Sequence, residues 1–120
     1  MAFDNGESTQ YLLGTSHTEA ESQNYYEDAE VAKFVSEEDT IWRVHTHPGE
    51  NGTKGGSGYD FSKPTGDLRC WLILNSKFKR EYKKPMPKMY VYHPFSQQLY
   101  QFNGKKNNIL VPGGIFSLFK

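Results

Sequence analysis

This 120-residue chain has little cysteine, no net charge and no long apolar stretch, and each of these excludes a class of structure or function. Cys70 is the single cysteine, so an intramolecular disulfide and a zinc site built on paired cysteines are both excluded. Fourteen basic and fourteen acidic side chains cancel, so the sequence predicts no binding to nucleic acid or to a membrane surface. No apolar stretch approaches transmembrane length, and residues 1–6 lack a signal-peptide pattern.

The sequence is rich in aromatic residues although only 36% of it is hydrophobic. Aromatic residues make up 15% of the chain, far above what a disordered chain would contain. A length of 120 residues suits one domain with a modest core. We therefore expect a single domain over residues 1–120, of the α/β or α+β class, with large rings in its core.

Periodicity and turn residues predict short elements separated by loops. A hairpin is expected from Met89–His93 and Leu99–Phe102, and residues 49–58 and 77–88 are expected to be a flexible glycine loop and an exposed basic connection. The remaining expected elements are strands at 10–14, 40–44 and 109–111 and helices at 27–37 and 68–78, with a strand at 71–74 as the competing interpretation of the second helix.

Two histidines one residue apart, His45 and His47, end the strand Thr40–Val44 and are followed by Pro48-Gly49. Side chains at i and i+2 of a strand point to the same face, so both imidazoles project together. Two imidazoles and a carboxylate form a common catalytic zinc site, which keeps its fourth position open. Asp60 and Asp67 follow the glycine loop, and each is a candidate third ligand.

The order of these residues resembles the JAB/JAMM (MPN-type) zinc metalloproteases. That family carries an early glutamate, then H-x-H-P, then a serine and an aspartate that opens a helix. The resemblance covers Glu7 to about Phe78 and includes the segment Glu7–Gly14, in which the glutamate precedes an apolar run. It implies a small mixed β-sheet flanked by helices, as in the MPN/JAB (cytidine deaminase-like) fold, with Zn²⁺ as cofactor and Glu7 as general base.

The spacing after the histidines departs from the family's S-x-x-D. Ser57-x-x-Asp60 fits that pattern only with a two-residue insertion before it. We favour Asp67 as the third ligand, because the start of a buried helix fixes a backbone better than a glycine-rich loop does. For the serine that binds the oxyanion we name Ser62, with Ser57 and Thr65 as competitors.

The compact chain and its H-T-H-P strand look like the JAB-like domains of bacterial polymorphic toxins. The resemblance implies a zinc-dependent peptidase or isopeptidase that cleaves a peptide or an isopeptide-linked protein. It also implies an immunity protein as partner if the chain is a toxin. The location stays open between the cytoplasm and secretion as an effector. Two alternatives stay open: a catalytically degenerate MPN-like interaction module, and a metal-dependent nuclease that uses the two histidines.

Overall fold

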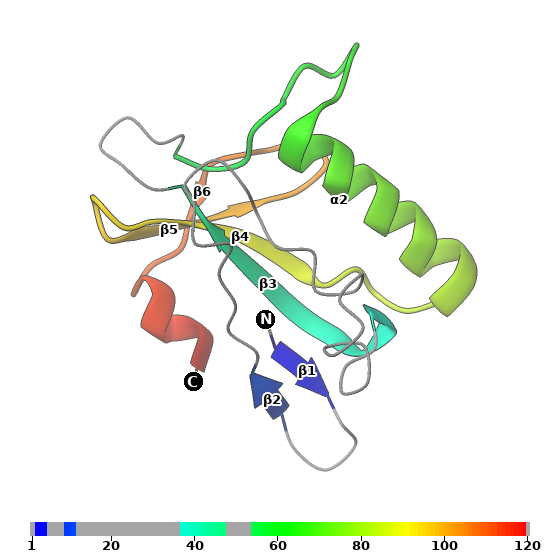
Figure 1. Cartoon of the computed structure of the whole chain (residues 1–120), viewed down its shortest axis with the longest axis horizontal. Coiled ribbons are helices and arrows are strands. Elements are labelled where there is room, and N and C mark those ends of the chain that lie inside the picture. Colours follow the sequence, from blue (N-terminus) through cyan, green and yellow to red (C-terminus); the bar gives the residue numbers. More distant parts are fainter. Residues whose placement is uncertain (1, 5–8, 12–36, 48–53, 120) are drawn as a thin grey trace.

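The computed structural model describes residues 2–4, 9–11, 37–47 and 54–119. Its strands form one six-stranded sheet in the order β2-β1-β3-β4-β5-β6. The central pair, β3 (Thr40–Thr46) and β4 (Lys88–His93), is parallel, and the other neighbours are antiparallel. The outer strands are β1 (Ala2–Asp4), β2 (Thr9–Tyr11), β5 (Gln98–Phe102) and β6 (Ile109–Leu110). The expected mixed sheet of an α+β protein is therefore confirmed (Figure 1).

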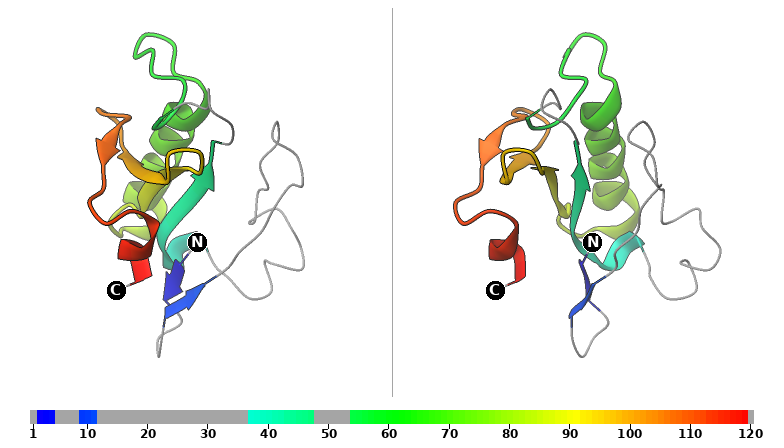
Figure 2. Two further views of the ribbon diagram at one scale, coloured as in Figure 1. Left: turned by 90° about the vertical axis from the view of Figure 1, so that its left-hand side faces the viewer. Right: turned by 60° about the vertical axis from the view of Figure 1, so that its left-hand side comes forward.

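Helix α2 (Gly66–Lys77) lies on the connection between the two parallel strands. Parallel strands require a crossover of this kind, because the first strand ends and the second strand begins at opposite ends of the sheet. Figure 2 shows α2 on one side of β3 and the C-terminal 3₁₀ helix η3 (Ile115–Phe119) on the other. The helix thus brings its first turn close to the carboxyl end of β3.

The main core lies between α2 and the sheet. Leu74 and Phe78 pack against Met89, Val91 and Phe102, all of them buried. Met89 and Val91 alternate along β4 and pair in register with Arg43 and His45 of β3. Because paired residues of neighbouring strands share a face, His45 lies on the side that α2 covers.

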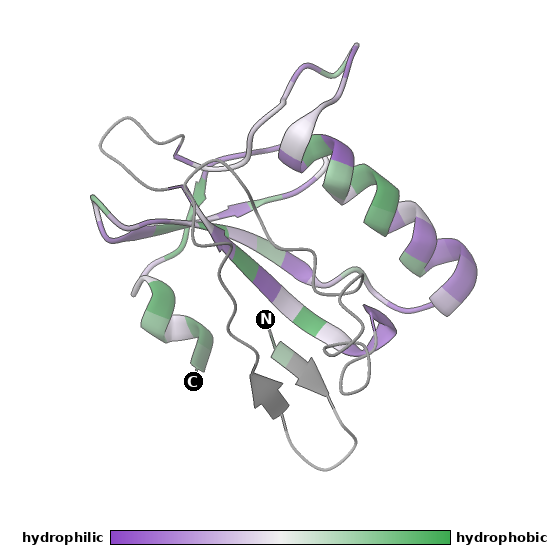
Figure 3. Ribbon diagram, in the orientation of Figure 1, coloured by the Kyte–Doolittle hydropathy of each residue, from purple (hydrophilic) through white to green (hydrophobic). Residues whose placement is uncertain are grey.

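The C-terminal helix η3 lies against the opposite face. Figure 3 shows that it is mostly hydrophobic. The rings of Trp42 and Phe119 meet edge to face, with centroids 5.6 Å apart. The sequence did not predict η3 or strand β1.

The segment 77–88 differs from the exposed connection that we expected. Lys77 ends α2, and a π-helical turn, η2, continues over Phe78–Tyr82. The rings of Phe78 and Tyr82 meet edge to face at 4.9 Å, and Phe78 is only 1% exposed. Burial of Phe78 and partial burial of Tyr82 keep the chain helical until Lys83, which adopts a left-handed conformation.

The other predictions divide between confirmed elements and residues outside the described part. The hairpin, the histidine strand and the last strand are confirmed, and residues 71–74 are helical rather than extended. Gly55 and Gly56 of the glycine loop are buried, and the Gly56 amide donates to the carbonyl of Asn107. Residues 12–14, nearly all of the expected helix 27–37, and residues 49–53 lie outside the described residues. No helix in the described part is long and apolar enough to cross a membrane.

Candidate metal centre

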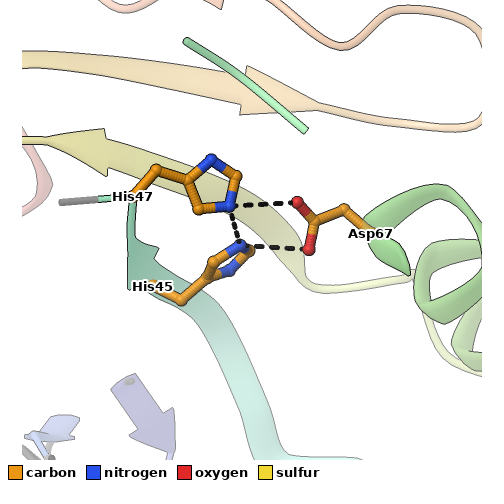
Figure 4. Close-up of side chains that lie close together, drawn as sticks. All are labelled: His45, His47 and Asp67. Atoms are coloured by element: carbon orange, nitrogen blue, oxygen red, sulfur yellow. Dashed lines mark hydrogen bonds and ion pairs between the residues drawn. The ribbon is translucent and has the colours of Figure 1, made fainter. Parts of the chain in front are cut away.

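The two imidazoles lie together at the carboxyl end of β3. Their Nε2 atoms are 3.2 Å apart and their ring centroids 4.9 Å apart (Figure 4). The His47 amide donates to the carbonyl of Tyr92 at 3.0 Å, so the parallel pairing with β4 extends to His47 and fixes its backbone. The side chains of His45 and His47 are 33% and 18% exposed, which leaves both nitrogens accessible from one side.

Asp67 completes the cluster from the first turn of α2. Its Oδ1 lies 3.0 Å from His45 Nε2 and its Oδ2 lies 3.4 Å from His47 Nε2. One ligand atom from each of the three residues lies within 4.8 Å of the others. Asp60, the competing carboxylate, is exposed and accepts hydrogen bonds from Ser62 instead.

The distance between the two imidazole nitrogens is that of two ligands on a tetrahedral metal ion. Ligands about 2.0–2.1 Å from a tetrahedral ion are about 3.3 Å from one another. The two imidazole nitrogens are 3.2 Å apart, and each lies 3.0 or 3.4 Å from a different oxygen of Asp67. With one oxygen of Asp67 as ligand, the three donor atoms lie within 4.8 Å of one another. Two imidazoles and one carboxylate are also ligands that Zn²⁺ accepts, and three ligands leave a fourth position for water or substrate.

Asp67 is held in its ionised form. Burial opposes its ionisation, but hydrogen bonds with His45 and His47, and one from the Ser57 amide, outweigh burial and hold its pKa far below the usual range. A carboxylate ligand must be deprotonated, so the site is prepared for a cation before one binds.

Ser57 connects Asp67 to the chain that follows the histidines. The Ser57 amide donates to Asp67 Oδ2 at 2.8 Å, and its hydroxyl lies 3.1 Å from the same oxygen. In the other direction, the Asp67 amide donates to Ser57 Oγ at 3.2 Å. This reciprocal pair resembles a capping box, although Ser57 is ten positions before Asp67 and the N-cap residue of α2 is Thr65. The Leu68 amide adds a bond to the Ser57 carbonyl. Ser57 thus caps α2 and orients its carboxylate.

The chain between Ser57 and Asp67 leaves the site and returns to it. We call residues 59–65 the excursion loop. Its ends meet where the Thr65 amide donates to the Gly58 carbonyl at 3.2 Å. Gly58 and Gly66 both have positive φ, and a Cβ on Gly58 would lie only 1.9 Å from the Thr65 oxygen.

A tyrosine anchors the excursion loop to the body of the domain. The Tyr59 hydroxyl donates to the Asn103 carbonyl at 2.5 Å, and the ring packs against the core. Burial and the negative charge of Asp67 raise the pKa of Tyr59 to about 12, so the hydroxyl remains a donor. The loop is therefore attached at Tyr59 as well as at its two ends.

Ser62, the serine that we named for the oxyanion, lies on the excursion loop. It is exposed there, and its hydroxyl donates to Asp60 Oδ1 at 2.6 Å. Of the three hydroxyl candidates, Ser57 is the one hydrogen-bonded to Asp67. Gly58 and Gly66 are the sequence signal that could have identified it, because Ser57-Gly58 joined to Gly66-Asp67 reads S-x-x-D. Glu7, the expected general base, lies outside the described residues.

Comparison with known proteins agrees with this geometry. The model of the family "JAB-like toxin 1" matches residues 1–70, more than half of the chain. The match includes both histidines, Ser57 and Asp67. Neither the curated proteins nor the solved structures gave a match. The chain belongs to the JAB-like toxin family.

Proposed function

We propose that this domain is a zinc-dependent peptidase or isopeptidase that acts as a toxin effector. The observation that carries the proposal is the cluster of His45, His47 and Asp67, in which one ligand atom from each residue lies within 4.8 Å of the others. Membership of the JAB-like toxin family supports the same chemistry. In this proposal the three side chains hold Zn²⁺, with both imidazoles neutral and Asp67 ionised.

A zinc ion bound there would supply a Lewis acid that lowers the pKa of water to about 7 and polarises a carbonyl. Ser57 keeps the Asp67 carboxylate in place through its amide and its hydroxyl, which both donate to Oδ2. To donate to a developing oxyanion, the hydroxyl would have to turn away from Asp67. Glu7 is proposed as the general base that takes a proton from water and passes it to the leaving amine.

Metal content is the first test. Wild-type protein purified without chelators should contain about one zinc per chain by elemental analysis, and His47→Ala and Asp67→Asn should contain little. Asp60→Asn is the matched control, because it changes the competing carboxylate and should keep the metal. Protein that takes up no zinc would support the alternative of a degenerate interaction module.

Hydrolysis is the second test. Zinc-loaded protein incubated with a mixed peptide library should give new termini by mass spectrometry, and Glu7→Gln should reduce the rate by at least about 100-fold. Equal cleavage by the wild type and by Glu7→Gln would remove Glu7 from the mechanism. Cleavage of DNA or RNA instead of peptides would favour the nuclease alternative.

The toxin assignment adds a prediction in cells. Expression in a bacterium without an immunity protein should arrest growth, and Asp67→Asn should relieve the arrest while the variant protein accumulates to the same level. If growth arrest persists with Asp67→Asn, toxicity does not depend on the metal site.

A further inference from the structure

A cavity of about 350 Å³ lies between β3 and α2 beside the metal ligands. Its walls come from the two elements that carry those ligands. Arg43 lies two residues before His45 on the same face of β3, and Cys70 lies one helical turn after Asp67. Gly66, next to Asp67, also lines it. Arg43 and Gly66 therefore place the cavity next to the metal ligands in the chain, although none of the three ligands lines it.

Cationic side chains dominate the cavity. Arg43 and Arg69 both line it, and Arg69 is exposed and forms no ion pair with any described residue. Glu37 is the carboxylate in the lining. It already binds Lys77 Nζ at 2.8 Å and accepts a hydrogen bond from the Tyr82 hydroxyl at 3.0 Å. The described lining is thus positive overall.

The remaining lining suits a short aliphatic stem. The Arg43 guanidinium lies near the Cys70 thiol of α2, where burial raises the pKa of the thiol and the positive charge of Arg43 partly offsets that rise. Leu74 and Ile73 supply apolar walls further along the helix. An anionic group at the end of two or three methylenes would meet both kinds of surface.

We propose that this cavity is a subsite for a carboxylate of the substrate, next to the amide that is cleaved. This inference rests on the proposed function. Arginine suits the role because its planar guanidinium binds carboxylates through two parallel hydrogen bonds. The carboxylate can belong to an acidic side chain or to a chain terminus, since both present the same anionic group.

Binding to zinc-free protein tests the subsite separately from hydrolysis. NMR titrations would follow the arginine Nε–Hε signals with three probes. N-acetylglutamate α-amide offers a side-chain carboxylate, N-acetylleucine a terminal one, and N-acetylglutamine α-amide neither. At least one acid should shift the Arg69 signal and bind about tenfold or more tightly than the glutamine probe. Equal binding of all three probes, or no binding of either acid, would overturn the subsite.

Two charge-removing variants locate the effect. Arg69→Gln should weaken binding of the acid about tenfold, whereas Arg80→Gln, an exposed arginine on η2 outside the cavity, should leave it unchanged. Equal loss in both variants would show a general charge effect and refute the subsite. If the zinc-loaded protein cleaves no peptide but Arg69-dependent binding persists, the hydrolase proposal fails and the subsite stands. Cleavage with no preference for acidic residues would remove the subsite alone.

Discussion

Two aspartates seven residues apart show how backbone position selects a ligand. Asp67 lies on the first turn of a helix whose amides are capped, and hydrogen bonds to its carboxylate fix it toward the imidazoles. Asp60 lies on an exposed loop, where bonds to Ser62 occupy Oδ1. The same carboxylate therefore serves as a candidate ligand at one position and as a turn residue at the other.

Ser57 offers a prediction about the role of a single side chain. Ser57→Ala removes the hydroxyl contact with Asp67 and the acceptor of the Asp67 amide, although the Ser57 amide bond remains. Loss of a helix cap costs about 1–2 kcal/mol of unfolding free energy, and loss of a side chain that orients a ligand weakens metal affinity about 10–100-fold. Denaturant unfolding and zinc competition with a chelator dye would measure the two effects.

Ser62→Ala is the control for this substitution. It removes a hydroxyl on the exposed part of the excursion loop, so stability and zinc affinity should both remain near the wild-type values. A larger effect from Ser62→Ala than from Ser57→Ala would contradict the role of Ser57 in capping α2 and orienting Asp67.

At the level of structural elements, we expect the excursion loop to be unnecessary for the metal centre. Deletion of residues 59–65 joins Ser57-Gly58 to Gly66-Asp67 and restores the S-x-x-D spacing without moving the capped ends. We expect the shortened protein to bind one zinc per chain. Its melting temperature should fall, because Tyr59 packs on the core and bonds Asn103.

Tyr59→Ala separates these two effects. Its loss of stability should account for most of the loss in the deletion variant. A deletion variant that folds, by circular dichroism, but binds no zinc would show that the loop itself holds the ligands in place.

The extension of α2 into η2 gives a second prediction for an element. Phe78→Ala should lower the free energy of unfolding by about 3–5 kcal/mol, because a fully buried ring is lost from the core. Phe61→Ala, the same substitution at a ring that is 63% exposed, should change it by less than about 0.5 kcal/mol. Chemical denaturation of both variants would test whether 77–82 is part of the core, and similar losses would contradict it.

For the molecule as a whole, a metal ion would connect the two sides of the crossover. His45 and His47 come from β3 and Asp67 from α2, so a ligand that binds only the folded chain stabilises the whole domain. Zinc at about 100 times its Kd should add about 2.7 kcal/mol. That corresponds to a rise in Tm on the order of 10 °C. Calorimetry with zinc, with EDTA and with Asp67→Asn would measure this, and an equal rise in Asp67→Asn would place the metal elsewhere.

The sequence predicted the features that depend on local chemistry. The alternation around His45 and His47 indicated one strand face, and Asp67 was favoured for its place at a helix start; the structure brings these three side chains together. It kept Ser57 as a candidate but did not pair it with Asp67, because the two residues are separated by the excursion loop, where local spacing carries no information. The helix expected over 68–78 placed Phe78 on its buried side, as the structure does, but the basic residues after Phe78 hid the continuation of the helix to Tyr82.

The hydrogen bond between the Thr65 amide and the Gly58 carbonyl closes the excursion loop, and this affects which sequence patterns can identify relatives. Since Ser57 and Asp67 contact each other directly, the number of residues between them can change without moving either side chain. Relatives can therefore carry inserts of very different length at this point, and a search with a fixed serine-to-aspartate spacing would overlook them. Searches for such toxins should allow a variable gap bounded by two glycines.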